Sequence, residues 1–294
     1  MNDVIATLPR SRWDELPDTE AGSVTAALES GQVLFLPRLR FVLEPDETRF
    51  LTPSCSDGKA KNVSYDVATR QLRGTSLDGT ERAALSAMIA RFSEHARRLV
   101  ETLCPHYVPH LIMGRTSYRP VEVVGRPASV TKDDSRLHVD AFSSTPNHGR
   151  RILRVFSNIN PGGSPRVWEI GEPFEAMSAK FYPGVRRPLP GSAWLLEKLH
   201  VTKDRRSEYD HIMLQLHDRA KRDNRYQQNA PKLRFEFPPG STWVVYTDRV
   251  MHAALSGQYL LEQTFYLPVA AMQEERLAPL RTLERIAGRR LAPS

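Results

Sequence analysis

Apolar residues recur at helical spacing in three parts of the chain, and each part predicts an amphipathic helix. The longest spans residues 80–103, where large apolar side chains return every three or four positions. A second helix is expected over 208–223, because Ser207 and Asp210 have the spacing of a capping box at its start. A third begins near Pro279 and carries arginines between its leucines. We expect this third helix to pack on the domain or on a partner subunit, with an anionic surface as the alternative.

Short apolar runs rich in Val, Ile, Phe, Trp and Tyr predict strands elsewhere in the chain. These runs cover residues 33–36, 152–159, 164–170, 241–246 and 263–267. Turn residues bound them, notably Asn-Pro-Gly-Gly at 160–163 and Pro-Pro-Gly at 238–240. Because most of the strands cluster in the second half, that part is expected to close into a β-barrel or a sandwich. The chain is therefore predicted to be one α+β domain on a β-barrel core, with the first helix against its outer face.

Composition narrows the class of protein. The 294 residues are 40% apolar, which is enough for a core and excludes a chain that is disordered throughout. No apolar stretch approaches the roughly 18 to 20 residues of a membrane span, and residues 1–13 lack the apolar centre of a signal peptide. Cys55 and Cys104 are the two cysteines, so neither a disulfide framework nor a cysteine zinc site is expected. A cytoplasmic setting is the default expectation.

The chain is moderately basic, with 41 Lys and Arg against 34 Asp and Glu and a net charge of +7. Such a surface suits an acidic substrate or an anionic membrane, although charge alone also fits a solvated surface with no specific partner. Nucleic-acid binding is not expected, because no nucleic-acid motif occurs and the aromatic residues are not interleaved with basic ones.

His138 and Asp140 are the first candidates for chemistry. On a strand, residues two apart face the same side, so this pair would present an imidazole and a carboxylate together. A 2-His-1-carboxylate triad holds Fe(II) on one face and leaves other positions open for cosubstrate and oxygen. The pair needs a third ligand, and without one it is better explained as an exposed histidine beside an aspartate.

His252 is the best third ligand, since it follows the 241–246 strand on the far side of the strand cluster. The alternative is a core histidine, because its neighbours in the sequence are apolar. The other histidines fit less well: His95 and His217 are expected on polar helix faces, His106 and His110 flank prolines, and His148 and His200 are expected in loops.

Two arginines are candidates for binding an anion. Arg154 lies in the middle of an apolar strand, where a guanidinium needs a negative partner because it keeps its charge. That partner is either a structural Asp or Glu or the carboxylate of a cosubstrate, held by a bidentate fork. Arg119 is a second candidate, although the sequence around it favours a surface position.

At this point the residues resemble a known class. His138-x-Asp140 with distal His252 is similar to the metal site of iron and 2-oxoglutarate-dependent oxygenases. Four longer stretches resemble the Kdo hydroxylase family, where Kdo is the 3-deoxy-octulosonic acid sugar of lipopolysaccharide. These stretches are Lys-Asn-Val-Ser-Tyr-Asp at 61–66, Leu-His-Val-Asp-Ala-Phe at 137–142, Arg-Val-Phe-Ser-Asn-Ile-Asn-Pro at 154–161 and Pro-Arg-Val-Trp-Glu-Ile-Gly-Glu-Pro-Phe at 165–174.

The resemblance implies an α+β fold with a double-stranded β-helix core, a cupin-like jelly-roll flanked by helices. It implies a single dioxygenase domain over 1–294, with a helix-rich portion at 1–110, the jelly-roll core at 111–270 and a C-terminal helix at 271–294. The implied enzyme uses Fe(II), 2-oxoglutarate and O₂ to hydroxylate carbon 3 of Kdo in Kdo-lipid A. Its products would be the sugar Ko, succinate and CO₂.

By the same resemblance, His138, Asp140 and His252 would bind the iron, and Arg119 and Arg154 would bind 2-oxoglutarate. One departure concerns the cosubstrate. Many such oxygenases place a basic residue shortly after the distal histidine, whereas this chain has none there. Arg154, on another strand, is therefore expected to meet the cosubstrate carboxylate.

A lipid-linked substrate implies work at the inner face of the cytoplasmic membrane, where the basic C-terminal helix could contact the lipid. Possible contacts with the acidic sugar are Lys59, Lys61, Arg70, Arg73 and Arg115, each of which also fits a plain surface charge. Three rival functions remain: an oxygenase for another small molecule, a hydrolase on the same metal site, and a non-catalytic jelly-roll that binds a sugar.

Overall fold

The computed structural model describes residues 4–15 and 21–292, so the first three residues of the segment tested for a signal peptide lie outside it. The helices are α1 (Ala21–Ser30), α2 (Gly79–Leu103), α3 (Phe174–Phe181), α4 (Ser192–Lys198), α5 (Glu208–Arg222), α6 (Asn224–Asn229) and α7 (Pro279–Ala287). The strands are β1 (Ile5–Thr7), β2 (Val33–Leu36), β3 (Val63–Asp66), β4 (Gln71–Arg73), β5 (Ile112–Arg119), β6 (Arg151–Asn158), β7 (Arg166–Ile170), β8 (Leu233–Phe237), β9 (Thr242–Tyr246), β10 (His252–Ser256) and β11 (Leu260–Leu267).

Two sheets form the core of the fold. The larger has the order β1-β2-β9-β6-β11-β5-β3-β4, and the smaller has the order β10-β7-β8. Aromatic side chains from both sheets fill the space between them: Phe156 on β6, Trp168 on β7, Phe237 on β8 and Trp243 on β9. This arrangement confirms the predicted jelly-roll core with flanking helices.

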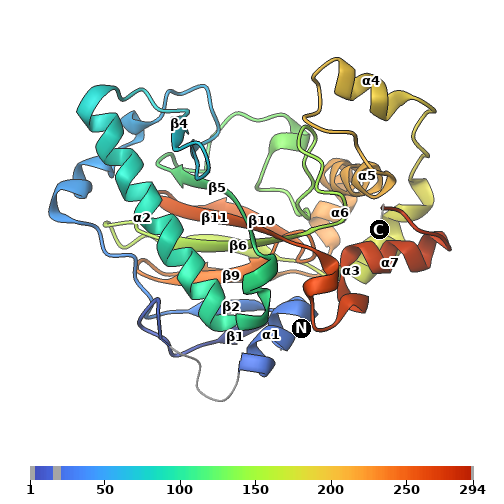
Figure 1. Cartoon of the computed structure of the whole chain (residues 1–294), viewed down its shortest axis with the longest axis horizontal. Helices are drawn as coiled ribbons and strands as arrows, with labels where there is room; N and C mark the ends of the chain where they lie inside the picture. Colours follow the sequence, from blue (N-terminus) through green and yellow to red (C-terminus); the bar gives the residue numbers. More distant parts are fainter. Residues whose placement is uncertain (1–3, 16–20, 293–294) are drawn as a thin grey trace.

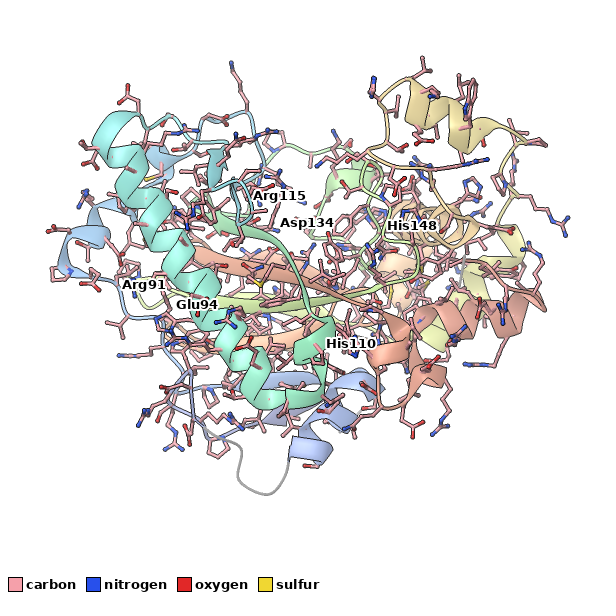
Figure 2. All side chains as sticks on the ribbon, in the orientation of Figure 1. Arg91, Glu94, His110, Arg115, Asp134 and His148 are labelled. Atoms are coloured by element: carbon pink, nitrogen blue, oxygen red, sulfur yellow. The ribbon has the colours of Figure 1, made fainter. Side chains whose placement is uncertain are left out.

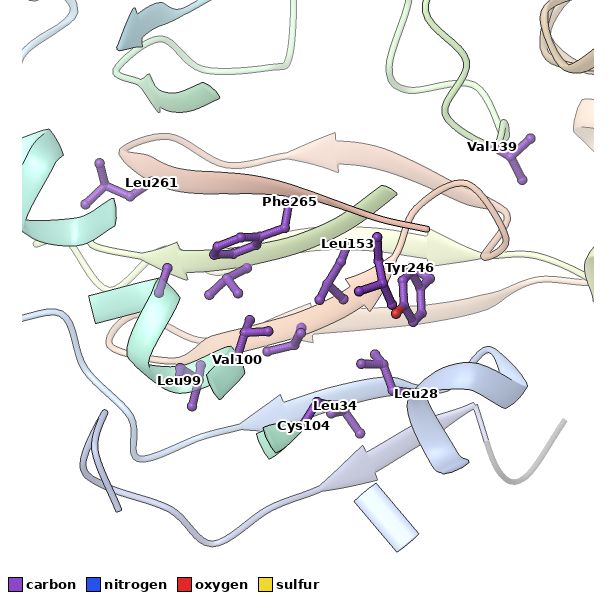
Figure 3. Packing of buried hydrophobic residues seen from close by; sticks show 14 of the residues in the cluster. Leu28, Leu34, Leu99, Val100, Cys104, Val139, Leu153, Tyr246, Leu261 and Phe265 are labelled. Atoms are coloured by element: carbon purple, nitrogen blue, oxygen red, sulfur yellow. The ribbon is translucent and has the colours of Figure 1, made fainter. Parts of the chain in front are cut away.

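Helix α2 covers the outer face of the larger sheet (Figure 1). Leu99 and Val100 of this helix belong to the same buried cluster as Leu261 and Phe265 of β11 (Figure 3). Because side chains alternate along a strand, Glu262 and Thr264, which lie between these two on β11, face the interior of the jelly-roll instead. The predicted position of the long helix is confirmed, and its packing leaves the inner face of the sheet free for a site.

The predicted helices and strands all occur, with ends shifted by a few residues. Six strands were not predicted: β1, β3 and β4 at the margins of the larger sheet, and β5, β8 and β10 within residues 111–270. Strand β5 was missed because its inward positions carry Arg115, Ser117 and Arg119, so no apolar run marks it. Helix α7 packs on the domain, with Leu280 and Leu283 buried. No helix in the described part of the chain has both the length and the apolarity to cross a membrane.

Candidate metal centre and its cavity

His138, Asp140 and His252 converge at one edge of the smaller sheet. The backbones of His138 and His252 pair directly, with N–H···O distances of 3.0 and 2.9 Å in the two directions. The Asp140 N–H donates to the carbonyl of Thr247 at 2.8 Å. One potential ligand atom from each of the three side chains lies within 4.8 Å of the others. A pair close in sequence and a histidine 112 residues further on are thus brought together by backbone hydrogen bonds.

The two imidazole rings are oriented for metal binding. The Nδ1 of His138 donates to the carbonyl of Arg136 at 2.7 Å, and the Nδ1 of His252 donates to the carbonyl of Val250 at 2.8 Å. Since a carbonyl can only accept, both Nε2 atoms are left with a free lone pair. Metal-binding histidines in proteins usually have their second nitrogen held in this way.

The electrostatics of the triad favour the forms that bind a metal. Burial, together with His252 and Lys221, lowers the pKa of His138 well below its ordinary value, and burial also lowers the pKa of His252. Burial alone would raise the pKa of Asp140, but Arg154 and the two histidines outweigh it and hold that pKa well below the usual range. Neutral imidazoles beside an ionised carboxylate are the protonation states that a divalent cation requires.

Aromatic rings pack against both metal-centre histidines. Trp168 stacks on His252 with ring centroids 5.0 Å apart and an angle of 23° between the planes. His217 meets His138 edge-on at 5.4 Å. The prediction that His217 lies on the polar face of its helix was wrong: it is only 9% exposed, because the face of α5 that carries it closes over the metal centre.

The triad opens into a cavity of about 800 Å³. The cavity is lined by the inner faces of β5, β6, β7 and β11 and by residues of α5 and of the loops near 61 and 131–145. Asp134, on one of these loops, lies between Arg115 and His148 in the view of Figure 2. The cavity is large enough for a sugar-sized ligand next to a metal centre.

Glu262 of β11 binds two arginines on neighbouring strands. Arg154 lies 3.0 Å from one of its carboxylate oxygens, and Arg119 lies 2.7 Å from the other. Arg154 also lies 3.2 Å from Asp140, so it links Glu262 to the metal centre. Both arginines therefore have structural acidic partners and line the same cavity. The sequence-based preference for Arg119 as a surface residue was wrong, since its side chain is 16% exposed.

Asp134 is a second cavity carboxylate that is surrounded by cations. It forms an ion pair with Lys61 and lies 3.5 Å from Arg119 and 3.8 Å from Lys221. The Lys221 side chain is buried and has one further weak contact, to the carbonyl of Thr131 at 3.3 Å. One carboxylate thus faces three positive groups at the cavity wall.

Arg166 is a candidate functional residue that sequence reasoning missed. It lies on β7, is 3% exposed, and lines the cavity with Arg119 and Arg154. It donates to the carbonyl of Gly257 at 2.8 Å, and its Nε has no partner among the described residues. Burial and the nearby Arg119 lower its pKa to about 10. Strand alternation, which places it on the same face as Trp168, was the signal that could have found it.

Gly257 makes room for this arginine. Its backbone has φ of +121°, and a Cβ atom there would lie 2.7 Å from the Cδ of Arg166. The turn before β11 can therefore approach β7 closely only with glycine at this position. Its carbonyl is the one hydrogen-bond acceptor that the Arg166 guanidinium has within residues 4–15 and 21–292.

Positive charge exceeds negative charge in the cavity lining. The cations are Lys61, Arg115, Arg119, Lys132, Arg154, Arg166, Lys203 and Lys221, and the anions are Asp66, Asp134, Asp140, Asp218 and Glu262. Such a lining favours a ligand with several negative charges.

Comparison with known proteins agrees with this geometry. The family model described as 3-deoxy-D-manno-oct-2-ulosonic acid (Kdo) hydroxylase matches residues 12–290. A crystal structure of the Kdo hydroxylase KdoO with cobalt(II) is 45% identical, with a TM-score of 0.97 over 99% of this chain and 98% of that one. Another, with α-ketoglutarate and Fe(III), is 44% identical, with a TM-score of 0.95 over 98% and 97%. A comparison with curated protein sequences finds no match.

The jelly-roll, the 2-His-1-carboxylate triad and the cationic cavity define a non-haem Fe(II) and 2-oxoglutarate-dependent dioxygenase. Within this class, the chain belongs to the Kdo hydroxylase family.

Proposed function

We propose that this enzyme hydroxylates carbon 3 of Kdo in Kdo-lipid A to give Ko, with 2-oxoglutarate converted to succinate and CO₂. The observation that carries the proposal is the convergence of His138, Asp140 and His252 in the wall of a cavity with excess positive charge. The 45% identity to a Kdo hydroxylase over almost the whole chain supports the choice of substrate.

The three side chains of the triad would hold Fe(II). Both Nε2 atoms are available, and the Asp140 carboxylate is held by Arg154, whose guanidinium lies 3.2 Å from its Oδ2. When bound, the iron supplies oxygen activation coupled to the oxidative decarboxylation of 2-oxoglutarate. The protein's own contribution is to fix the two rings through their Nδ1 hydrogen bonds and to keep Asp140 ionised through Arg154.

Three arginines would hold the carboxylates of 2-oxoglutarate. Arg154, which already contacts Asp140, is the guanidinium linked most directly to the triad. Arg119 shares Glu262 with it and was also expected from the sequence. Arg166 adds a guanidinium with no carboxylate partner among the described residues, so it is the one most in need of an anion. Together they substitute for the basic residue that is missing after His252.

The acidic sugar would be held by the cations around Asp134. The carboxylate of Kdo is attached to carbon 2, which neighbours the carbon that reacts. It must therefore lie close to the metal centre when the sugar is in place. Lys221 is near enough to His138 to contribute to the low pKa of that histidine, and Lys61 shares Asp134 with it. These two lysines are the proposed carboxylate contacts.

The lipid part of the substrate implies that the enzyme works at the inner face of the cytoplasmic membrane. A peripheral contact there is part of the proposal. The partner is thus a lipid-linked acidic sugar rather than a nucleic acid.

Succinate release with Fe(II) and 2-oxoglutarate, with and without Kdo-lipid A, tests the function. We expect Kdo-lipid A to stimulate release by the wild type, and His138→Ala to abolish it. His110→Ala is the matched control, because His110 is exposed and lies away from Asp134 (Figure 2). It should retain full activity.

The same assay separates the rival functions. Equal succinate release from the wild type and His138→Ala would contradict the catalytic assignment. Release that ignores Kdo-lipid A but responds to another small molecule would contradict only the substrate. Sugar binding without succinate would indicate a binding protein, and product formation without oxygen would indicate a hydrolase.

A further inference from the structure

We propose that two segments at the rim of the cavity, residues 120–132 and 185–206, dock the enzyme on an anionic lipid bilayer. We call them together the rim surface. The inference deepens the proposed function and rests on it for the lipid-linked substrate. It concerns a surface that the catalytic chemistry does not use.

Large apolar side chains are exposed on both segments. Most of the exposed large apolar residues in the described part of the chain belong to the rim surface: Val121, Val124 and Val130 on the first segment, and Leu189, Trp194, Leu195, Leu199 and Val201 on the second. The exposed fraction reaches 64% at Val124 and 77% at Leu189. Five of these residues fall between Leu189 and Val201, and exposed large apolar side chains gathered in this way usually mark an interaction site.

Helix α4 carries the centre of this apolar patch. None of its seven residues is buried, although Trp194 and Leu195 lie on it side by side in sequence and are each 50% exposed. The helix stands away from the sheets at the top right of Figure 1. Its apolar side chains therefore contribute almost nothing to the core, and their presence needs another explanation.

Basic residues surround the apolar ones. Residues 185–206 contain six lysines and arginines against two acidic residues, and Lys132 ends the other segment. Tryptophan and leucine within a cationic border are typical of protein segments that lie in the interface of an anionic membrane. The same charge opposes self-association, because two copies meeting through this surface would bring like charges together. An anionic bilayer is therefore the partner that fits.

The rim surface is joined to the cavity. Lys132 and Lys203 line the cavity and are themselves exposed, so they stand at its opening. The N–H of Lys203 donates to the carbonyl of Ser144 at 2.9 Å, and Ser143, next in the chain, lines the cavity and accepts from Arg206. Docking through this surface would place the opening against the headgroups, where a lipid-linked sugar is presented.

Helix α7, the membrane contact considered from the sequence, fits less well. Its leucines are buried against the domain. Arg281 is paired with Glu275 at 2.8 Å and Glu284 at 2.9 Å, and Arg289 is paired with Glu208. Arg281 on the helix and Arg289 just after it are therefore neutralised, and Ile286, at 41% exposed, is the one large apolar side chain that α7 exposes.

Tryptophan fluorescence with vesicles tests the proposal directly. The chain has four tryptophans, and Trp13, Trp168 and Trp243 are at most 8% exposed, so Trp194 dominates any change caused by surface binding. Vesicles of phosphatidylglycerol and phosphatidylcholine should shift the emission to shorter wavelength, and phosphatidylcholine alone should do so far less. No shift with the anionic vesicles, or a shift that is retained in Trp194→Phe, would overturn the proposal.

Matched variants locate the surface. Leu195→Ser with Leu199→Ser should weaken sedimentation with anionic vesicles by on the order of tenfold for each leucine. Val42→Ser, at a residue that is 70% exposed but outside the rim surface, should bind like the wild type. Equal binding by all three proteins would overturn the assignment. A blue shift on concentrating the protein without vesicles would identify a second copy as the partner and overturn it as well.

Activity separates this inference from the proposed function. The leucine variant should oxidise deacylated, water-soluble Kdo substrate at the wild-type rate and vesicle-embedded Kdo-lipid A several-fold more slowly. Equal rates for both proteins on the vesicle-embedded substrate would contradict the rim surface. A wild type inactive on both substrates would contradict the proposed function, while the vesicle-binding result would still decide the docking surface.

Discussion

Arg154 and Glu262 form a 3.0 Å ion pair inside the cavity although they are not opposite each other in the sheet. Thr264 is the residue of β11 that pairs with Arg154. Glu262 lies two positions away and reaches Arg154 diagonally, and it reaches Arg119 on the other side in the same way. One carboxylate on the central strand thus holds two arginines that would otherwise repel each other.

Replacing this carboxylate should destabilise the protein in a way that the cosubstrate reverses. Glu262→Gln leaves two buried guanidinium groups short of negative charge, so the free energy of unfolding should fall by about 3–5 kcal/mol. Added 2-oxoglutarate should restore part of this loss by supplying carboxylates. Urea unfolding with and without 2-oxoglutarate measures both effects. Glu236→Gln, at an exposed residue of β8, should change stability by less than about 0.5 kcal/mol; a similar loss in both variants would contradict the prediction.

Arg166 should show opposite effects on stability and on cosubstrate binding. Arg166→Met removes a buried charge that has no acidic partner among the described residues, so the cosubstrate-free protein should keep or gain stability. The same change should raise KM for 2-oxoglutarate by on the order of 10- to 100-fold, since a charge-assisted contact is lost. Thermal unfolding and succinate kinetics test the two effects. Arg234→Met, at an exposed site on β8, is the control. Unchanged KM in Arg166→Met would remove this residue from the cosubstrate site.

Trp168 should position His252 rather than contribute only to the core. Trp168→Ala removes the ring that stacks on His252 and should weaken Co(II) binding by on the order of 10- to 100-fold. Trp168→Phe keeps a stacking ring and should recover most of the affinity. Trp243→Phe changes the same aromatic cluster without a ring contact to His252 and should bind Co(II) normally. A titration followed by Co(II) absorbance measures all three, and a loss in Trp168→Ala that Phe does not rescue would indicate a packing effect.

The two cysteines should be inert in the folded protein. Burial raises the pKa of Cys55 to about 11 and that of Cys104 to about 12. Because a raised pKa keeps a thiol protonated, the reactive thiolate should be on the order of one part in a thousand or less at pH 8. A colorimetric thiol reagent should therefore detect neither cysteine in the native protein and both in denaturant. Rapid native labelling of either one would contradict this.

The sequence by itself determined the local part of this protein. Strand alternation placed His138 and Asp140 on one face, and helical spacing marked α2 and its apolar side. The capping box of Ser207 and Asp210 is formed as predicted. The position of His252 after the 241–246 strand made it the candidate third ligand, and resemblance to a known family added the jelly-roll. These features could be predicted because each depends on residues close together in the chain or on a pattern shared with known proteins.

The tertiary structure decided which faces meet. The two-residue alternation of side chains assigns the residues of a strand to two faces, but it does not say which face points into the fold. That depends on the order of the strands in the sheet, which hydrogen bonds between distant segments set. For this reason the sequence favoured a surface position for Arg119 and the polar face of a helix for His217, and it did not indicate Arg166 at all. All three line the cavity because β5, β7 and α5 surround it. Glu262 gained its role in the same way, since only the pairing of β11 with both β5 and β6 puts one carboxylate between two arginines.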